Sequence, residues 1–255
     1  MKGISMRIRA ATLILSVALV AAGCASQRAN DELVADPYQD INREIHQVNK
    51  EIDILLLKPA SEVYDLATPA LVKHLISNEI RHLQLPGIFV NRVLQGEAEE
   101  AAAVFTRFGI NTLMGAGGLL DPATEFGLPY EPTDFGATLA TWGVGEGVYH
   151  ELPFFGPSTT RHAAGRVVDF VLDPVSLATG GVISPGFINV PNAITTARTP
   201  VTIVNIRHEN ANFINQVLYE SEDSYISART GYVQTRRRQV AGGETDVEEL
   251  PDIFD

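Results

Sequence analysis

Histidine and hydroxyl side chains are the groups of this chain that could do chemistry. The best catalytic candidate is His162, which follows Ser158, Thr159 and Thr160. Such hydroxyl residues are also typical N-caps of a helix, and we favour that interpretation. An esterase triad assembled from distant positions stays open as the alternative. None of the six histidines has the spacing of a metal ligand, so no metal site is expected: His46, His74, His82, His150, His162 and His208.

A glycine-rich segment, Gly143-Val-Gly145-Glu-Gly147, resembles the loop that binds a dinucleotide. Val148 stands where the third glycine belongs, and no strand is expected before the loop. The sequence also lacks a phosphate loop ending in Gly-Lys-Ser/Thr, a Gly-x-Ser-x-Gly elbow and a His-Glu-x-x-His motif. We therefore expect neither a cofactor nor an enzyme.

The single cysteine, Cys24, lies at the end of a secretory signal. Three basic residues in the first nine positions precede an apolar run at 10–22, which is shorter than the roughly 20 residues of a membrane-spanning helix. Ala21-Ala22-Gly23-Cys24 has the form of a lipobox, so residues 1–23 are expected to be cleaved and Cys24 to be lipidated. Ala25 follows, with no aspartate to indicate retention in the inner membrane, which favours the outer membrane.

The composition is acidic, with 31 Asp and Glu against 19 Lys and Arg and a net charge of −12. This balance argues against binding to nucleic acid. With no cysteine after position 24, no disulfide can stabilise the fold. We expect a lipidated tether at 24–35, one domain at 36–241 and a disordered acidic tail at 242–255.

The elements that must position these residues are mostly helices, with one small hairpin. Segment 36–57 begins with Asp36 as expected N-cap, and Ile41, Ile45, Val48, Ile52 and Leu55 recur at helical spacing. This face is expected to pack on the core or to meet acyl chains. Helical spacing continues in three more segments, at 97–108, 164–172 and 191–220.

Two features modify this helical pattern near the C-terminus. Thr199-Pro200 is expected either to separate two helices or to kink a continuous one, and the β-branched run 201–204 is more consistent with helix than with strand. A last helix is expected from Asp223 to about Arg238, and the cluster Arg236-Arg237-Arg238 is expected to interact with its C-terminal dipole.

Glycines are concentrated in the middle of the chain, where nine of the 21 lie within 109–147. Glycine permits positive φ angles and close backbone approach, as bending or closely packed helices require. Gly115, Gly117 and Gly118 come just before Asp121-Pro122, which predicts a loop leading into a helix with Asp121 as N-cap.

Four blocks of this sequence resemble motifs of the MlaA (VacJ) lipoproteins, and together they cover most of the mature chain. The chain departs from the family pattern at Gln39, Val148 and His162, where Glu, Pro and Asp are common. The blocks are DPYQDINREIHQVNKEID at 36–53, FTRFGINTLMGAGGLLDPA at 105–123, TDFGATLATWGVGEGVYHELPFFGPSTTRHAAGRVVDFVLDP at 133–174, and DSYISARTGYVQTRR at 223–237.

The resemblance implies an outer-membrane lipoprotein that removes misplaced glycerophospholipid from the outer leaflet and passes it to a periplasmic carrier of the MlaC type. It also implies a ring of amphipathic helices in the inner leaflet, around an amphipathic channel, in association with a trimeric porin. A lipid-cleaving esterase and a structural lipoprotein that scaffolds a porin are the alternatives.

Two sets of residues are candidates for the lipid site. The glycine loops are expected to border the lipid path, although tight turns explain the same residues equally well: Gly115, Gly117, Gly118, Gly143 and Gly145. The first helix is expected to pack in the core or to gate the channel, by analogy with the family: Ile41, Asn42, Ile45 and Val48.

Overall fold

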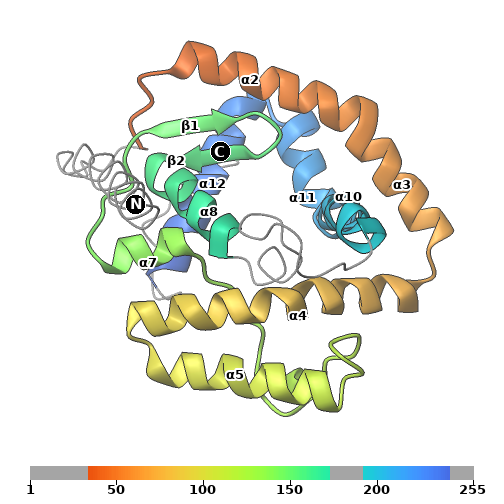
Figure 1. Cartoon of the computed structure of the whole chain (residues 1–255). Helices are drawn as coiled ribbons and strands as arrows, with labels where there is room; N and C mark the ends of the chain where they lie inside the picture. Colours follow the sequence, from red (N-terminus) through yellow and green to blue (C-terminus); the bar gives the residue numbers. More distant parts are fainter. Residues whose placement is uncertain (1–33, 173–191, 242–255) are drawn as a thin grey trace, which may run out of the picture.

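The computed structural model describes residues 34–172 and 192–241, which form helices and one two-stranded hairpin (Figure 1), as expected from the sequence. The elements are α2 (Gln39–Ile52), η1 (Asp53–Leu57), α3 (Lys58–Ala67), α4 (Ala70–Gln95), α5 (Ala98–Leu113), α6 (Pro122–Glu125), α7 (Phe135–Thr141), β1 (Tyr149–Leu152), β2 (Gly156–Thr159), α8 (Thr160–Leu172), α10 (Asn192–Glu209), α11 (Ala211–Asn215), η2 (Gln216–Glu220) and α12 (Ser224–Val240).

The first three elements form one long helical arm, and Figure 1 shows α2, η1, α3 and α4 curving around α8, α10 and α11. The segment η1 is a single wide π-helical turn, in which the Lys58 amide donates to the carbonyl of Asp53. Pro59 explains this turn, because a proline in a continuing helix lacks an amide and displaces the carbonyl four residues earlier. The arm therefore extends past the expected end at residue 57.

Asp36 is not the N-cap of this arm, contrary to expectation. The helix begins at Gln39 with Tyr38 at the cap position, where no side chain caps it. The Asp36 carboxylate instead accepts hydrogen bonds from the side chains of Asn42 and Tyr225. A long-range contact has replaced the local one that the sequence predicted.

Helices α4 and α5 pack against each other as an antiparallel pair. Gly96 ends α4 with φ at +81°, and the amide of Glu97 returns to the carbonyl of Arg92, which reverses the chain. Leu85, Ile88 and Val104 form a small apolar core between the two helices. The expected helix 97–108 thus extends to Leu113.

The hairpin and α12 form the second apolar core, built around Val34, Tyr149, Tyr225 and Val233. Strands β1 and β2 are antiparallel, with Tyr149 opposite Thr159. Strand β2 leads directly into α8, and the Thr159 hydroxyl accepts a hydrogen bond from the amide of His162 at 3.4 Å. The predicted helix cap by the hydroxyl cluster is confirmed.

Two expectations for the C-terminal helices are also settled. Helix α10 continues through Pro200, so the expectation of two separate helices is wrong and that of one continuous helix holds, and the run 201–204 is helical. Helix α12 begins directly after Asp223, as predicted, and the Asp223 carboxylate caps it by accepting hydrogen bonds from the amides of Tyr225 and Ile226.

Candidate functional site

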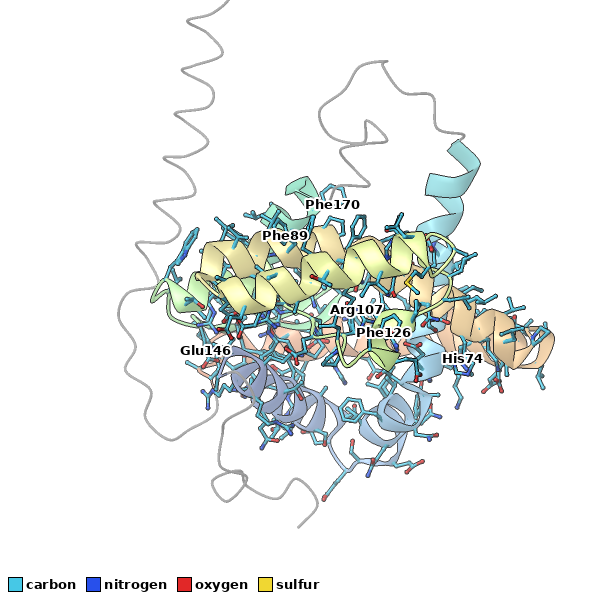
Figure 2. All side chains as sticks on the ribbon, turned by 90° about the horizontal axis from the view of Figure 1, so that it is seen from below. His74, Phe89, Arg107, Phe126, Glu146 and Phe170 are labelled. Carbon is cyan, nitrogen blue, oxygen red and sulfur yellow. The ribbon has the colours of Figure 1, made fainter. Side chains whose placement is uncertain are left out.

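The distribution of polarity in the described residues is the reverse of that in a water-soluble protein. Buried polar and charged residues outnumber buried hydrophobic ones, while large hydrophobic side chains lie on the surface of most helices. Leu66 is 88% exposed and Leu113 is 86% exposed. Figure 2 shows Phe89 and Phe170 at the same edge of the molecule. Apolar surface of this extent is typical of contact with lipid or with another protein.

Helix α2 shows this inversion most clearly. Ile41 and Val48 are 58% and 51% exposed, so packing on the core, one of the two alternatives for this face, is wrong for them, and contact with acyl chains stays a prediction. The buried side is a polar stripe on the adjacent face of the helix, which we define as Asn42, His46, Asn49 and Asp53; Asn49 is half-buried and the other three are buried. These residues recur at spacings of three and four, so the sequence already contained the periodicity of a buried polar face, which the prediction from the apolar residues did not include.

The polar stripe satisfies the free edge of the hairpin. The Asn42 side chain accepts from the amide of Glu151 at 3.0 Å and donates to the carbonyl of Tyr149. Two helical turns later, Asn49 donates to the carbonyl of Leu152 at 3.0 Å and accepts from the amide of Phe154 at 2.8 Å. Each amide side chain thereby provides the donor and acceptor that a neighbouring strand would provide.

Charged groups close around this contact between α2, the hairpin and α12. His46 Nδ1 lies 3.4 Å from Glu151 Oε1, and both side chains are almost fully buried. His46 Nε2 is within hydrogen-bond distance of the Ser224 hydroxyl. On the outer side, Arg43 and Asp223 form a bidentate ion pair. The helix is therefore held by polar contacts rather than by its apolar face, and a gating role for Ile41, Asn42, Ile45 and Val48 stays a prediction.

A second buried pair joins the two π-helical turns. Arg207 of α10 forms a bidentate ion pair with Asp53 of η1, at 2.7 and 3.1 Å, and Tyr219 of η2 donates to the same carboxylate. Arg207 and Asp53 lie 154 residues apart in the sequence. Sequence analysis did not identify this pair.

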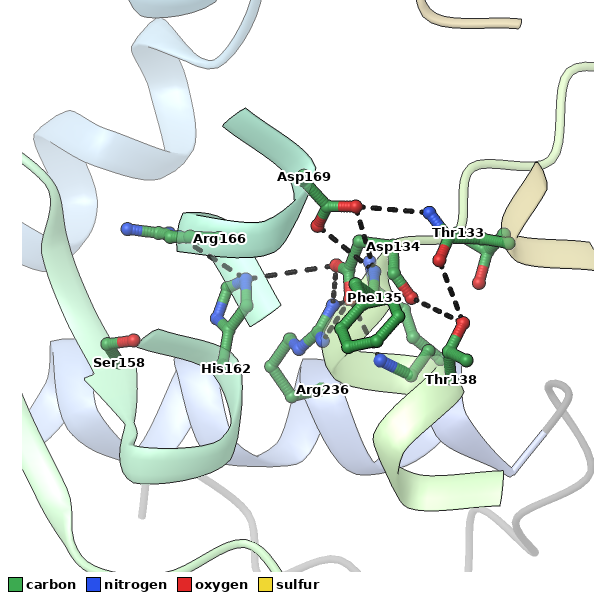
Figure 3. Close-up of polar contacts among 12 residues, drawn as sticks. Thr133, Asp134, Phe135, Thr138, Ser158, His162, Arg166, Asp169 and Arg236 are labelled. Carbon is green, nitrogen blue, oxygen red and sulfur yellow. Dashed lines mark hydrogen bonds and ion pairs between the residues drawn. The ribbon is translucent and has the colours of Figure 1, made fainter. Parts of the chain in front are cut away.

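The third polar cluster contains His162 and lies where α7, α8 and α12 meet (Figure 3). Asp134 caps α7 by accepting from the amide of Ala137, and it forms a bidentate ion pair with Arg236 at 2.7 and 3.0 Å. Burial opposes ionisation of Asp134, but the hydrogen bonds and charge of Arg236 prevail and lower its pKa. Arg237 pairs with Glu146, so tertiary ion pairs, and not only the helix dipole, account for two of the three C-terminal arginines.

Both ring nitrogens of His162 are already engaged. Its Nδ1 lies 2.6 Å from the Tyr232 hydroxyl, and its Nε2 accepts from Arg166 Nε at 3.3 Å. Burial, together with the positive charges of Arg236 and Arg166, lowers the pKa of His162 to about 4. The imidazole is therefore neutral at pH 7 and poorly suited to accept a proton.

Ser158 is not positioned as a nucleophile for this histidine. Its hydroxyl donates to the carbonyl of Thr159 at 3.4 Å and makes no hydrogen bond to His162 among those formed by the described residues. The activated pair that an esterase requires is a serine within hydrogen-bond reach of its base. Ser158 and His162 thus make contacts that hold β2, α8 and α12 together, and they are not arranged as a nucleophile and its base.

The glycine loop after α5 is a tight turn. The amides of Gly117 and Gly118 return to the carbonyls of Thr112 and Asn111, and both glycines have positive φ angles, +78° and +108°. A Cβ on Gly118 would lie 2.3 Å from the ring of His82, and one on Gly115 would lie 2.5 Å from two carbonyl oxygens. These contacts confirm the turn interpretation, while a place for Gly115, Gly117 and Gly118 on a lipid path stays a prediction.

Asp121 stabilises the end of this turn. It caps α6 as predicted, by accepting from the amide of Thr124, and its carboxylate also accepts from Arg107 and Asn111. Burial alone would raise the pKa of Asp121, but these hydrogen bonds lower it overall.

Gly143 and Gly145 lie in the irregular segment between α7 and β1. Gly143 has φ at +85°, and its amide returns to the carbonyl of Ala140, which ends α7. Gly145 is exposed. The helix before this loop takes the place of the strand that a dinucleotide site would need. A lipid-path role for both glycines stays a prediction.

Several expectations concern residues that the structure does not describe. The signal peptide 1–23, Cys24 and the tail 242–255 lie outside the described residues. Within 34–172 and 192–241, no helix is both long and apolar enough to cross a membrane. The same residues contain no group of three or more His, Cys, Asp or Glu side chains arranged to hold a metal ion.

Comparisons with known proteins agree on one family. The model of the MlaA lipoprotein family matches residues 34–239. The intermembrane phospholipid transport system lipoprotein MlaA of Shigella flexneri is 30% identical over 96% of this chain and 94% of its own. The protein of the same name in Haemophilus influenzae is 31% identical over 94% of both chains.

A solved structure supports the same assignment. It is described as the structural basis for maintenance of bacterial outer membrane lipid asymmetry. It superposes with a TM-score of 0.68 and 27% sequence identity, covering 81% of this chain and 99% of the other. Sequence and fold together show that the chain belongs to the MlaA lipoprotein family.

Proposed function

We propose that this protein is an outer-membrane lipoprotein that takes mislocalised glycerophospholipid from the outer leaflet and passes it to a periplasmic carrier. Cys24 carries the lipid anchor, and the helical domain lies in the inner leaflet. A channel within the domain gives the headgroup a polar path, and retrograde transport through it maintains lipid asymmetry. Its partners are a trimeric porin and a carrier of the MlaC type, as the family resemblance implies.

The observation that carries this proposal is the apolar surface around a polar interior. Leu66, Phe105 and Leu113 are each about two-thirds or more exposed, and burying such side chains among acyl chains is favourable by about 25 cal/mol per Å². A surface of this kind in the inner leaflet needs no membrane-spanning helix. The relatives with curated names are components of a phospholipid transport system.

The polar interior supports transport rather than catalysis. A phospholipid headgroup loses its hydration inside a membrane, and buried polar groups offset part of that cost. His162, the best local catalytic candidate, is neutral and fully hydrogen-bonded, and Ser158 does not contact it. With no nucleotide-binding motif in the sequence, the energy for transport comes from the lipid gradient or from partner proteins.

Mass spectrometry of lipid bound to the detergent-extracted protein tests the proposal against its alternatives. Transfer predicts intact glycerophospholipid, hydrolysis predicts lysolipid, and a porin scaffold predicts no specific lipid. Cells that lack the protein should also accumulate phospholipid in the outer leaflet, measured by labelling with an amine-reactive reagent that does not cross the membrane. Wild-type asymmetry in such cells would contradict a transport role.

The membrane-facing surface can be tested without the lipid anchor. In a Cys24→Ala background, Val48→Asp should weaken binding to phospholipid vesicles by about tenfold or more, because a carboxylate in hydrocarbon costs about 2.5–3.5 kcal/mol. Thermal stability in detergent should stay close to that of the parent, since Val48 is exposed. Gln47→Asp, at an exposed polar position beside it, is the matched control and should bind normally. Equal binding by both variants would contradict membrane contact through this face.

A further inference from the structure

A cavity of about 340 Å³ lies between α4, the segment 130–134 and α8. Most of its exposed wall is apolar. Its polar groups come from three separate elements: Gln84 and Asn91 of α4, Tyr130, Thr133 and Asp134 of the connecting segment, and Asp169 of α8. Figure 3 shows Asp169 beside Thr133 and Asp134. Such a volume, with few convergent polar groups in an apolar wall, is within the range of small-molecule sites.

Within the part of the chain that the structure describes, one of the two carboxylates of the cavity has no matching cation. Asp134 is neutralised by Arg236, whereas the described donors to Asp169 are neutral: the Asn91 amide at 3.1 Å and the Phe135 backbone amide at 3.0 and 3.1 Å. No cationic side chain of the described residues forms an ion pair with Asp169. Burial accordingly raises the pKa of the Asp169 carboxyl. A half-buried carboxylate in this state is stabilised by a cationic ligand.

The chemistry of the lining favours an organic ammonium ion over calcium or magnesium. These ions take six or more oxygen ligands, whereas both carboxylates of the lining are already engaged, Asp134 by Arg236 and Asp169 by two N–H groups. A quaternary ammonium is bound by a cage of several aromatic rings, but Tyr130 is the one aromatic residue of this lining. A primary ammonium needs a carboxylate and one or two neutral acceptors, such as Gln84 Oε1.

We propose that this cavity binds the primary ammonium of an ethanolamine phospholipid headgroup, with Asp169 as its counter-ion. The proposal rests on the lipid-transport function given above and adds the headgroup class. Apolar surface beside the cavity fits the acyl chains: Val90 lines it and is 42% exposed, and Phe170, next to Asp169, is 65% exposed. A free amine without acyl chains would not contact this apolar surface.

Two variants test the cavity in different ways. Asp169→Asn removes the charge and keeps one oxygen acceptor for the Phe135 amide. Gly87→Leu fills the cavity and leaves the carboxylate intact, because a Cβ on Gly87 meets no atom within 4 Å and the residue lies within α4. Gly109→Leu is the matched control, since Gly109 lies within α5, is equally open and does not line the cavity.

The experiment presents the full-length lipoprotein in detergent with equal amounts of phosphatidylethanolamine and phosphatidylglycerol, and measures bound lipid by native mass spectrometry. Wild type and Gly109→Leu should prefer phosphatidylethanolamine. Asp169→Asn and Gly87→Leu should lose that preference by about tenfold, the effect of one charge-assisted hydrogen bond worth about 1.4 kcal/mol, while phosphatidylglycerol binding is unchanged. An unchanged preference in a folded Gly87→Leu variant would overturn the proposal.

A soluble probe separates this proposal from the transport function. Phosphoethanolamine should bind the wild type more tightly than glycerol 1-phosphate in calorimetric titration, and Gly87→Leu should abolish the difference. If the wild type retains neither lipid but still prefers phosphoethanolamine, the cavity is correct and the transport proposal fails. If both lipids bind equally and phosphoethanolamine shows no preference, the cavity proposal fails and transport stands. If the wild type prefers free phosphoethanolamine but shows no preference for phosphatidylethanolamine, the cavity binds a free amine, and the claim that its ligand is a phospholipid headgroup is overturned.

Discussion

Asn42 is expected to contribute more to stability than any exposed residue of α2, because its side chain makes the hydrogen bonds to β1 that a neighbouring strand would otherwise make. Asn42→Ala removes its hydrogen bonds to Asp36, Tyr149 and Glu151. The Glu151 amide and the Tyr149 carbonyl then lose their Asn42 partner. Both groups belong to buried residues, since Glu151 is 3% exposed and Tyr149 is 0% exposed. Each buried group left unpaired costs about 1–3 kcal/mol, so we expect a loss of about 3 kcal/mol in the free energy of unfolding.

Urea and thermal unfolding of the purified protein, followed by circular dichroism at constant detergent, measure this loss. For a domain of this size, 3 kcal/mol lowers the melting temperature by about 6–12 °C. Asn49→Ala is the matched control. Its backbone partners belong to the exposed Phe154 and the half-buried Leu152, where water can replace the lost contacts, and the Glu151 carboxylate that it also contacts keeps the Tyr149 hydroxyl as donor, which limits the cost to about 1 kcal/mol. Asn42→Asp should be worse than Asn42→Ala, since it places a second carboxylate beside Asp36.

Two results would refute this reasoning. One is a loss below about 1 kcal/mol for Asn42→Ala, which would mean that water or another side chain satisfies the edge of β1. The other is an equal loss for Asn42→Ala and Asn49→Ala, which would mean that burial does not set the cost. Either outcome would also remove the basis for treating the polar stripe as the attachment of α2.

Four further predictions concern the lipidation motif, the buried histidine and the glycine turn. Cys24→Ala should yield unprocessed or soluble protein in cell fractionation, and normal recovery and activity in the outer membrane would disprove lipid anchoring. Because folding lowers the pKa of His162 from 6.5 to about 4, the unfolded chain binds a proton more readily, and the free energy of unfolding should fall as the pH decreases from 6.5 toward 4. His162→Gln should weaken this pH dependence in unfolding titrations. An unchanged pH dependence would contradict the lowered pKa of His162. Gly117→Ala should destabilise the protein by roughly 1 kcal/mol, and Gly118→Ala by more, because the Cβ added at Gly118 meets the His82 ring and the one added at Gly117 does not. Equal melting temperatures of the two variants would contradict this. Gly117→Val, if folded and lipidated, should cause outer-leaflet phospholipid to accumulate, whereas wild-type asymmetry would exclude Gly117 from the lipid path.

Local patterns in the sequence were sufficient for the helical fold and for the starts of several helices, but not for the ends of the first arm or of α5. Asp121 caps its helix as predicted, and α12 begins directly after Asp223 as predicted, because the start of a helix depends on residues only two or three positions away. The hydroxyl cluster before His162 was identified as a cap for the same reason. The family was also recognisable, because its motif blocks are contiguous stretches of sequence.

The tertiary structure decided which face of each helix is buried. Helical periodicity shows that Ile41 and Val48 share a face, but it does not show whether that face meets protein or an apolar solvent. The partners of the buried polar residues are equally invisible in local sequence, since Asn42 and Glu151 lie 109 positions apart and Asp53 and Arg207 lie 154 apart. A buried polar side chain is stable only when a partner satisfies it, and for these residues the folded chain alone brings that partner within reach.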